Sequence, residues 1–148
     1  LIDDIGPGGA DAAYFVMDES LQETLLTGTD VAVCSDGSPT GFHPRGHGTF
    51  ARIIETFVRE RGVLSLAEAV RRMTALPAAI IGLEDRGRIS PGMAADIVVF
   101  DPAAVRERAT YVAPLQLAEG FDVVIVNGRV ARRDGALTGV RPGTVLTP

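Results

Sequence analysis

The sequence contains very little cysteine and few aromatic residues. Cys34 is its one cysteine, tryptophan does not occur, and aromatic residues make up 5% of the 148 positions. A single thiol cannot form a disulfide within the chain, so a secreted fold held together by disulfides is not indicated. We therefore expect a cytoplasmic protein.

The chain also lacks a long apolar run and a strongly basic segment. No stretch of about 18 apolar residues occurs, so we expect no contact with a membrane through a spanning helix. The formal net charge is −5, with acidic and basic residues mixed along the chain. Nucleic acid is therefore not an expected partner, because neutralising phosphates requires a clustered basic face. What is present, 46% hydrophobic and 22% charged residues, is typical of one globular domain.

Several stretches in the first part of the chain carry helix signals. Asp18 or Ser20 is positioned to cap the first helix, which contains a leucine stripe. Thr49 is predicted to begin the second, in which apolar residues recur every three or four positions. Ser65, followed by Glu68 three positions later, forms a capping box for the third.

The other segments carry strand signals. Residues 31–34 form a short valine-rich run, which is typical of a strand buried on both faces. Residues 96–139 are β-rich and contain Asn-Gly and Asp-Gly dipeptides at 127–128 and 134–135, which suit tight hairpin turns. We predict an α/β fold whose helical first part packs against its β-rich second part.

Asp36 is the first candidate for chemistry. It follows the predicted strand 31–34 and precedes Gly37. A carboxylate at the C-terminal end of a buried parallel strand is where barrel enzymes place catalytic groups. An aspartate before a glycine also caps turns in ordinary loops, and its position alone leaves both interpretations open.

Both histidines of the chain, His43 and His47, follow shortly after Asp36. Their spacing of four would place both imidazoles on one helical face, as in some zinc sites. Pro44, Gly46 and Gly48 argue against a helix there, and two histidines with one cysteine do not readily complete a closed tetrahedral site. We therefore predict no self-contained metal site in this segment.

Arg45, between the two histidines, carries a planar fork that binds carboxylates through two parallel hydrogen bonds. Above a catalytic strand it would hold an anionic substrate, and in an ordinary loop it would be a surface arginine or part of a structural ion pair. Cys34 lies in an apolar run, and no basic residue next to it would activate the thiol. We expect it to be buried and inert.

Four longer stretches together resemble one enzyme family. They are "SDG" (35–37), the stretch from "HPRGHGTF" to "TALPA" (43–78), "GLEDRGRISPGMAADIVVFDPA" (82–103) and "VIVNGRVARRDGALTGVRPGTVL" (124–146). The combination is similar to the C-terminal part of the N-acyl-D-amino-acid deacylases, which belong to the metal-dependent amidohydrolase superfamily. The last two stretches look like the superfamily in general, whereas "SDG" followed by "HPRGHGTF" is similar to the deacylase branch.

The resemblance implies a fold in two parts, a TIM-like barrel and a small β-sandwich. Residues 1–86 would be the C-terminal part of the barrel domain, with its last strand at about 31–34, and residues 87–148 would be the sandwich portion. The family's zinc ligands have no counterpart in this chain. We therefore expect a C-terminal fragment that is inactive alone, with Zn²⁺ bound in the full-length enzyme.

The resemblance also implies roles for the residues around Asp36. The reaction would be zinc-dependent hydrolysis of an N-acyl-D-amino acid to a carboxylate and a D-amino acid. Asp36 would move the proton from the metal-bound water to the leaving amine, and would be at most a weak or shared metal ligand. Arg45 would bind the substrate's α-carboxylate. His43 and His47 would contact substrate or shape the loop.

Two other functions remain open at this point. The chain would belong to a different amidohydrolase if the substrate were a cyclic amide, with Asp36 still the base. Alternatively, it would be a non-catalytic β-rich interaction module. In the enzyme interpretations the partner is a small-molecule substrate, and the exposed edges of a fragment would favour self-association.

Overall fold

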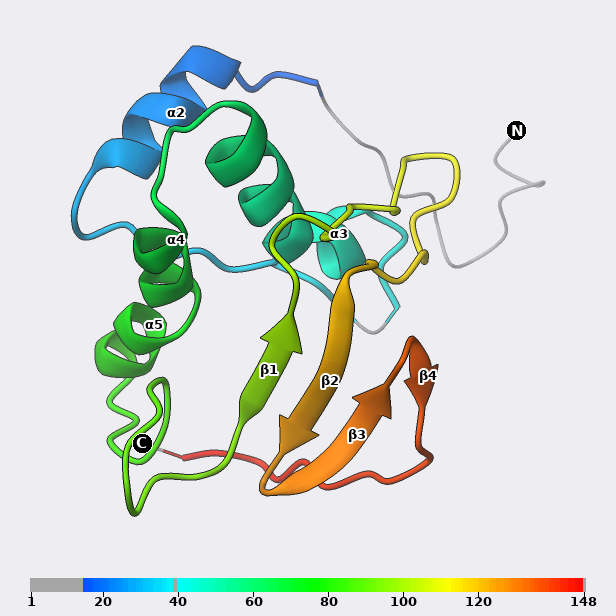
Figure 1. Cartoon of the computed structure of the whole chain (residues 1–148). Helices are drawn as coiled ribbons and strands as arrows, with labels where there is room; N and C mark the ends of the chain where they lie inside the picture. The colour runs from blue at the N-terminus through cyan, green and yellow to red at the C-terminus, as the bar shows by residue number, and fades with distance from the viewer. Residues whose placement is uncertain (1–14, 39, 148) are drawn as a thin grey trace, which may run out of the picture.

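A computed structural model describes residues 15–38 and 40–147, in which a helical part is followed by an antiparallel sheet (Figure 1). The helices are α2 (Glu19–Thr27), α3 (Arg45–Arg52), the π-helix η1 (Ile53–Glu60), α4 (Leu66–Met73) and α5 (Ala75–Ile80). The strands are β1 (Ile97–Phe100), β2 (Phe121–Val126), β3 (Arg129–Arg133) and β4 (Ala136–Leu137), which pair in the order β1-β2-β3-β4. In Figure 1 the helices lie on the side of β1, and β4 is farthest from them.

Two of the predicted helix caps are confirmed. The Asp18 carboxylate accepts hydrogen bonds from the N–H groups of Ser20 and Leu21, at 2.8 and 3.0 Å, and so begins α2. A hydrogen bond from the Ser20 hydroxyl, together with these two backbone bonds, lowers the pKa of Asp18. The Ser65 hydroxyl accepts a bond of 3.2 Å from the N–H of Glu68 at the start of α4. The Glu68 carboxylate binds two arginines of α4, so the structure confirms the cap at Ser65 but not the reciprocal half of the predicted capping box.

The predicted start of the second helix was wrong. The helix begins at Arg45 and runs through α3 into η1, so Thr49 lies inside it, and the Thr49 hydroxyl donates to the carbonyl of Arg45 at 2.8 Å. The expectation that the glycines prevent a helix here fails for a packing reason. A Cβ at Gly48 would lie 2.4 Å from a carboxylate oxygen of Glu107, so a side chain at this position would require the Glu107 side chain to move.

The two hairpin turns form where the dipeptides predict them. Asn127 and Gly128 have φ values of 47° and 75°, and Asp134 and Gly135 have 49° and 81°. Positive φ at both central residues matches the right-handed twist of the flanking strands. The turns therefore connect β2 to β3 and β3 to β4 directly.

Residues 31–34 do not form a strand with any described part of the chain. The segment has no regular secondary structure, and the N–H of Val33 donates to the carbonyl of Arg72 in α4 at 2.9 Å. A strand requires a neighbouring strand to complete its hydrogen-bond ladder. The sheet of this structure contains only residues from position 97 onward, among those described.

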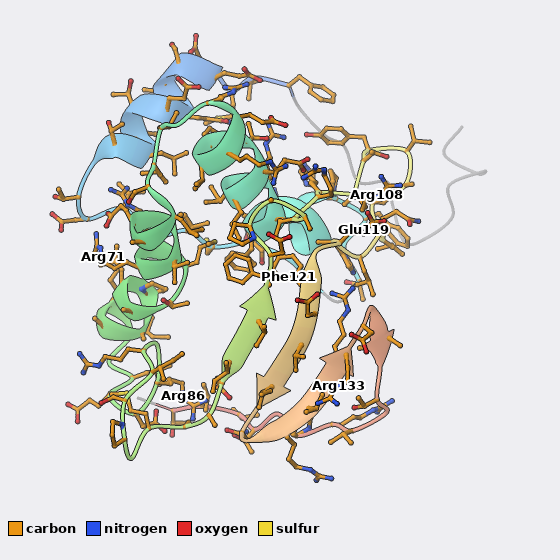
Figure 2. The ribbon with its side chains drawn as sticks, in the orientation of Figure 1. Arg71, Arg86, Arg108, Glu119, Phe121 and Arg133 are labelled. Carbon is orange, nitrogen blue, oxygen red and sulfur yellow. The ribbon has the colours of Figure 1, made fainter. Side chains whose placement is uncertain are left out.

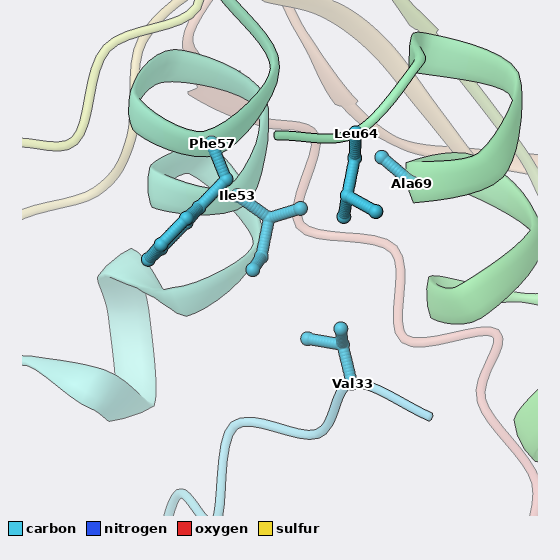
Figure 3. Packing of buried hydrophobic residues seen from close by; sticks show 5 residues of the cluster. All are labelled: Val33, Ile53, Phe57, Leu64 and Ala69. Atoms are coloured by element: carbon cyan, nitrogen blue, oxygen red, sulfur yellow. The ribbon is translucent and has the colours of Figure 1, made fainter. Parts of the chain in front are cut away.

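Two clusters of buried side chains form the core. The first joins segment 31–34 to the helices and contains Val33, Ile53, Phe57, Leu64 and Ala69 (Figure 3). The second joins helix to sheet, because Ala51 and Ile54 pack with Val105, and Phe100 and Phe121 pack against them (Figure 2). The predicted packing of the helical part against the β-rich part is confirmed by this second cluster.

Candidate active site

The turn that carries Asp36 packs against the first turn of α3. An ideal Cβ at Gly37 would lie 2.9 Å from the Cα of Gly46, so the two backbones approach more closely than any side chain at position 37 allows. The N–H of Gly37 also donates to the Ser35 hydroxyl at 3.2 Å. Asp36 itself has φ of 47°, a conformation uncommon for residues other than glycine. These contacts fix the backbone from which the Asp36 carboxylate projects.

Asp36 and Arg45, the two residues for which the sequence predicts a role in chemistry, form an ion pair. Nη2 of Arg45 lies 2.9 Å from Oδ2 of Asp36, and Nε of Arg45 donates to the Asp36 backbone carbonyl at 3.2 Å. The side chains are 77% and 49% exposed, respectively. An exposed pair of this kind stabilises a fold by only about 0–1 kcal/mol. Because both side chains are exposed in this chain, both groups are accessible to a ligand.

His43 lies at the start of α3 and contacts Arg45 through the backbone. Its Nδ1 accepts a hydrogen bond from the N–H of Arg45 at 3.1 Å. Its ring packs edge-on against the ring of Tyr111, with 5.2 Å between the ring centroids. The Tyr111 ring packs in the same way against Phe15, with a centroid distance of 4.8 Å. Tyr111 is a contact that sequence reasoning missed, and no local signal could reveal it because Tyr111 is far from His43 in the chain.

The two histidines do not form a metal-binding pair. His47 lies in α3 and is exposed, whereas His43 precedes the helix and its Nδ1 is engaged with Arg45. Within residues 15–38 and 40–147, no group of three or more His, Cys, Asp or Glu side chains could hold a metal ion. Cys34 is exposed, so the prediction of a buried thiol was wrong. Segment 31–34 has no strand neighbour in the part of the chain that the structure describes, and no described strand covers Cys34.

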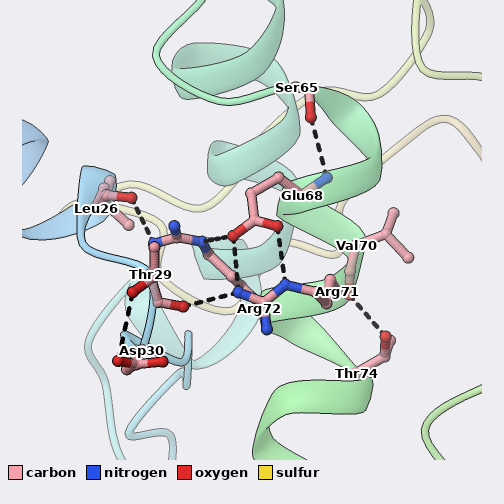
Figure 4. Close-up of polar contacts among 9 residues, drawn as sticks. All are labelled: Leu26, Thr29, Asp30, Ser65, Glu68, Val70, Arg71, Arg72 and Thr74. Carbon is pink, nitrogen blue, oxygen red and sulfur yellow. Dashed lines mark hydrogen bonds and ion pairs between the residues drawn. The ribbon is translucent and has the colours of Figure 1, made fainter.

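A network on α4 holds the chain that leads to Asp36 (Figure 4). Glu68 accepts hydrogen bonds from Arg71 at 2.8 Å and from Arg72 at 2.6 Å, and these bonds lower the pKa of Glu68 to about 2. Arg71 also donates to the carbonyl of Thr29, and Arg72, only 2% exposed, donates to that of Leu26. The segment before Asp36 is therefore fixed by side chains of a later helix.

A second network connects η1, which continues the helix of Arg45, to the loop after β1. The carboxylate of Glu55 in η1 pairs with Arg59 at 3.2 Å and accepts the N–H of Glu107 at 2.6 Å. Arg59 reaches the carbonyls of Pro102 and Val105 at 2.9 Å. Burial raises the pKa of Glu107, with Arg52 acting in the opposite direction and Glu55 adding to the rise. These bonds fix the helix of Arg45 relative to the sheet.

The sequence of the chain matches a known family of hydrolases. Residues 1–132 match the family described as the amidohydrolase family. The chain belongs to the amidohydrolase family.

Its relatives narrow the comparison further. An N-acyl-D-aspartate deacylase of Alcaligenes xylosoxydans xylosoxydans is 45% identical over 147 residues, which is 97% of this chain and 29% of that protein. A crystal structure of a D-aminoacylase is 42% identical, with a TM-score of 0.87 over 91% of this chain and 29% of that one.

A further solved structure contains bound zinc. The N-acyl-D-glutamate deacylase of Bordetella bronchiseptica, complexed with zinc and a phosphonate inhibitor that mimics the tetrahedral intermediate of the reaction, is 42% identical. Its TM-score is 0.83 over 91% of this chain and 29% of that one. The chain thus spans about 30% of the length of the relatives it matches. None of the helices in its described part has the length and apolar character needed to cross a membrane.

Proposed function

We propose that this chain contributes to a metal-dependent hydrolase that cleaves N-acyl-D-amino acids to a carboxylate and a D-amino acid. The observation that carries the proposal is the 2.9 Å approach of Asp36 to Arg45 on a fixed turn. It is supported by the relatives at 45% and 42% identity, which are deacylases of this kind. These relatives favour a linear amide substrate over the cyclic amide, and an enzyme over a non-catalytic interaction module.

Amide hydrolysis requires a group that takes a proton from the attacking water and returns it to the leaving amine. Asp36 is suited to this step because its carboxylate is 77% exposed and projects from a turn held by backbone contacts. Arg45 is suited to bind the α-carboxylate of the substrate through its fork. His43 contributes by holding the backbone of Arg45, whereas His47 keeps only the proposed role of a loop contact.

The described residues do not offer a zinc site of their own. We propose that zinc is held by ligands outside them, with Asp36 as at most a weak or shared ligand. The chemistry that zinc would supply when bound is polarisation of the amide carbonyl and activation of water.

The finer architecture is also a proposal. Residues 1–86 would complete a TIM-like barrel with segment 31–34 as its last strand, and residues 87–148 would belong to a small β-sandwich. Val33 supports this, since it packs under η1 and α4 as a barrel strand packs under its helices. A cytoplasmic location remains part of the proposal, as does a small-molecule substrate.

The test is the substitution Asp36→Asn in the full-length enzyme that carries this segment. We expect turnover of N-acetyl-D-amino acids to fall by about 10²–10⁴-fold, the usual contribution of a positioned proton-transfer group. Asp134→Asn is the matched control, because Asp134 is also an exposed aspartate at positive φ, 49° against 47°. Circular dichroism would verify that both variants fold.

Three results would contradict the proposal. One is an Asp36→Asn enzyme as active as the Asp134→Asn control. Another is cleavage of a ring amide without turnover of any N-acetyl-D-amino acid, which would favour the cyclic-amide alternative. The third is a full-length protein without amidase activity in the presence of zinc, which would favour the interaction module.

A further inference from the structure

The fork of Arg45 is already engaged in this structure, and this bears on how a substrate would bind. Its Nε and Nη2 atoms both contact Asp36, one at the backbone carbonyl and one at the carboxylate, at 3.2 and 2.9 Å. These two atoms form one planar edge of the guanidinium. A second carboxylate that binds side-on needs the same edge.

We propose that the substrate's α-carboxylate displaces the Asp36 carboxylate from Arg45, so that binding releases Asp36 to move a proton. This inference rests on the proposed function. It adds that Arg45 restrains Asp36 until a carboxylate-bearing substrate arrives. Asp36 and the substrate therefore exchange places on one arginine.

The backbone contacts make such an exchange feasible. The turn at Asp36 is held by the close approach of Gly37 to Gly46 and by the hydrogen bond from Gly37 to Ser35, neither of which involves the Arg45 side chain. A carboxylate bound side-on would also take Nε from the Asp36 backbone carbonyl, so these two glycine contacts are what keep the turn in place when the Asp36 side chain is released. His43 keeps the Arg45 backbone in place during the exchange, because its Nδ1 binds the main-chain N–H.

The exposure of the two groups limits the size of the effect. In this chain the pair is exposed, with side chains 77% and 49% accessible, and an exposed pair is worth only up to about 1 kcal/mol, which corresponds to about a fivefold change in the availability of Asp36. The same weakness lets a substrate carboxylate compete at ordinary concentrations. The restraint on Asp36 thus modestly favours substrates that carry a carboxylate. This preference adds to the one that comes from their direct contact with Arg45.

The experiment compares two substrates in the full-length enzyme that carries this segment, an N-acetyl-D-amino acid and its primary carboxamide. The carboxamide presents the same scissile bond without the carboxylate. In Arg45→Ala, we expect the KM for the acid to rise because its carboxylate contact is lost, and turnover of the carboxamide to increase by up to about fivefold because Asp36 is free. Arg45→Met is the second variant, since it keeps the aliphatic stem if the alanine form folds poorly.

Arg108→Ala is the matched control. Arg108 forms another exposed pair, with Glu119 at 3.4 Å, and its side chain is 56% exposed (Figure 2). This variant removes one positive charge and one exposed ion pair, as Arg45→Ala does. We expect it to leave the ratio of acid to carboxamide turnover unchanged.

A small carboxylate provides an independent readout. Formate added to the parent enzyme should raise carboxamide turnover by occupying Arg45, and should have no such effect on the Arg45 variants. Carboxamide turnover that is absent, unchanged or lower in both Arg45 variants would overturn the exchange, as would a lack of activation by formate. A parent enzyme that does not cleave the acid would instead overturn the proposed function.

Discussion

Gly37 and Gly46 are the two residues whose lack of a side chain lets the turn of Asp36 meet the helix of Arg45. Their surroundings differ, however. An ideal Cβ at Gly37 would lie 2.9 Å from the Cα of Gly46, whereas one at Gly46 would lie 3.7 Å from the Cα of Gly37. The first distance forces a backbone shift, and the second is ordinary van der Waals contact. At the residue scale, therefore, the site depends on one glycine more than on the other.

This difference predicts opposite effects for two alanine substitutions. Gly37→Ala should destabilise the fold by about 1–3 kcal/mol, as overpacking does, and should reduce turnover by displacing Asp36. Gly46→Ala should be neutral or stabilising by up to about 1 kcal/mol, because alanine favours a helix over glycine. Urea unfolding and kinetics of the full-length enzyme measure both quantities. Equal effects of the two substitutions would show that the close approach does not constrain the turn.

At the scale of elements, helix α4 holds a segment that precedes it, through contacts between residues 42 and 46 positions apart. Its Glu68 binds Arg71 and Arg72, and these arginines reach the carbonyls of Thr29 and Leu26 in the chain that leads to Asp36. The carbonyl of Arg72 also accepts the N–H of Val33. One helix thus satisfies polar backbone groups of a segment that has no strand neighbour among the described residues.

The pKa of Glu68, lowered to about 2 mainly by Arg71 and then Arg72, predicts a pH dependence of stability. A lowered pKa in the folded state means that the ionised form stabilises the fold above the ordinary value of 4.5, and that this contribution is lost as the pH falls toward 2. The Glu68→Gln variant should therefore have a lower urea midpoint than the parent at pH 7. The difference between the two midpoints should become smaller as the pH falls from about 5 to 2.

Glu60→Gln is the control for this prediction, because Glu60 is an exposed glutamate at the end of η1. It should shift the midpoint little at either pH. A Glu68→Gln protein whose deficit stays constant down to pH 2 would show that the ionised carboxylate is not what holds the two arginines.

At the scale of the whole molecule, the described sheet has two edge strands, β1 and β4, and β1 carries the longer apolar edge. Strand β1 pairs only with β2 among the described strands, and Val98 and Val99 on it are each 48% exposed. A strand edge with apolar side chains favours pairing with another chain. The helices do not cover these valines, because the second core cluster contacts the sheet through Phe100 and Phe121 instead.

We therefore predict that the isolated 148-residue chain self-associates through this edge. Light scattering should show a mass that rises with concentration, and Val99→Lys should reduce it, because a charge on an edge strand opposes pairing. Val112→Lys is the control, since Val112 is 97% exposed but lies in a loop. A parent chain that stays monomeric at all concentrations would contradict the prediction, as would equal effects of the two lysines.

Features determined by residues close together in the sequence were predictable without the structure. The hairpin turns at Asn127-Gly128 and Asp134-Gly135 and the caps Asp18 and Ser65 are of this kind. Each depends on the conformational preference or hydrogen bonding of residues a few positions apart. Asp36 and Arg45 were also identified as candidates from the sequence, although their positions left turn-capping and surface roles open and only the family resemblance implied their chemistry.

Other features were decided only by tertiary packing. The helix begins at Arg45 and packs closely against Gly37 and Glu107, although local propensity had argued against a helix there. Cys34 is exposed, and segment 31–34 is not a strand because a strand needs a neighbour that its own sequence cannot supply. The sequence by itself thus determined the turns, the caps and the chemical groups of the candidate site. Tertiary structure decided that Asp36 and Arg45 meet, because their distance depends on how a turn packs against a helix.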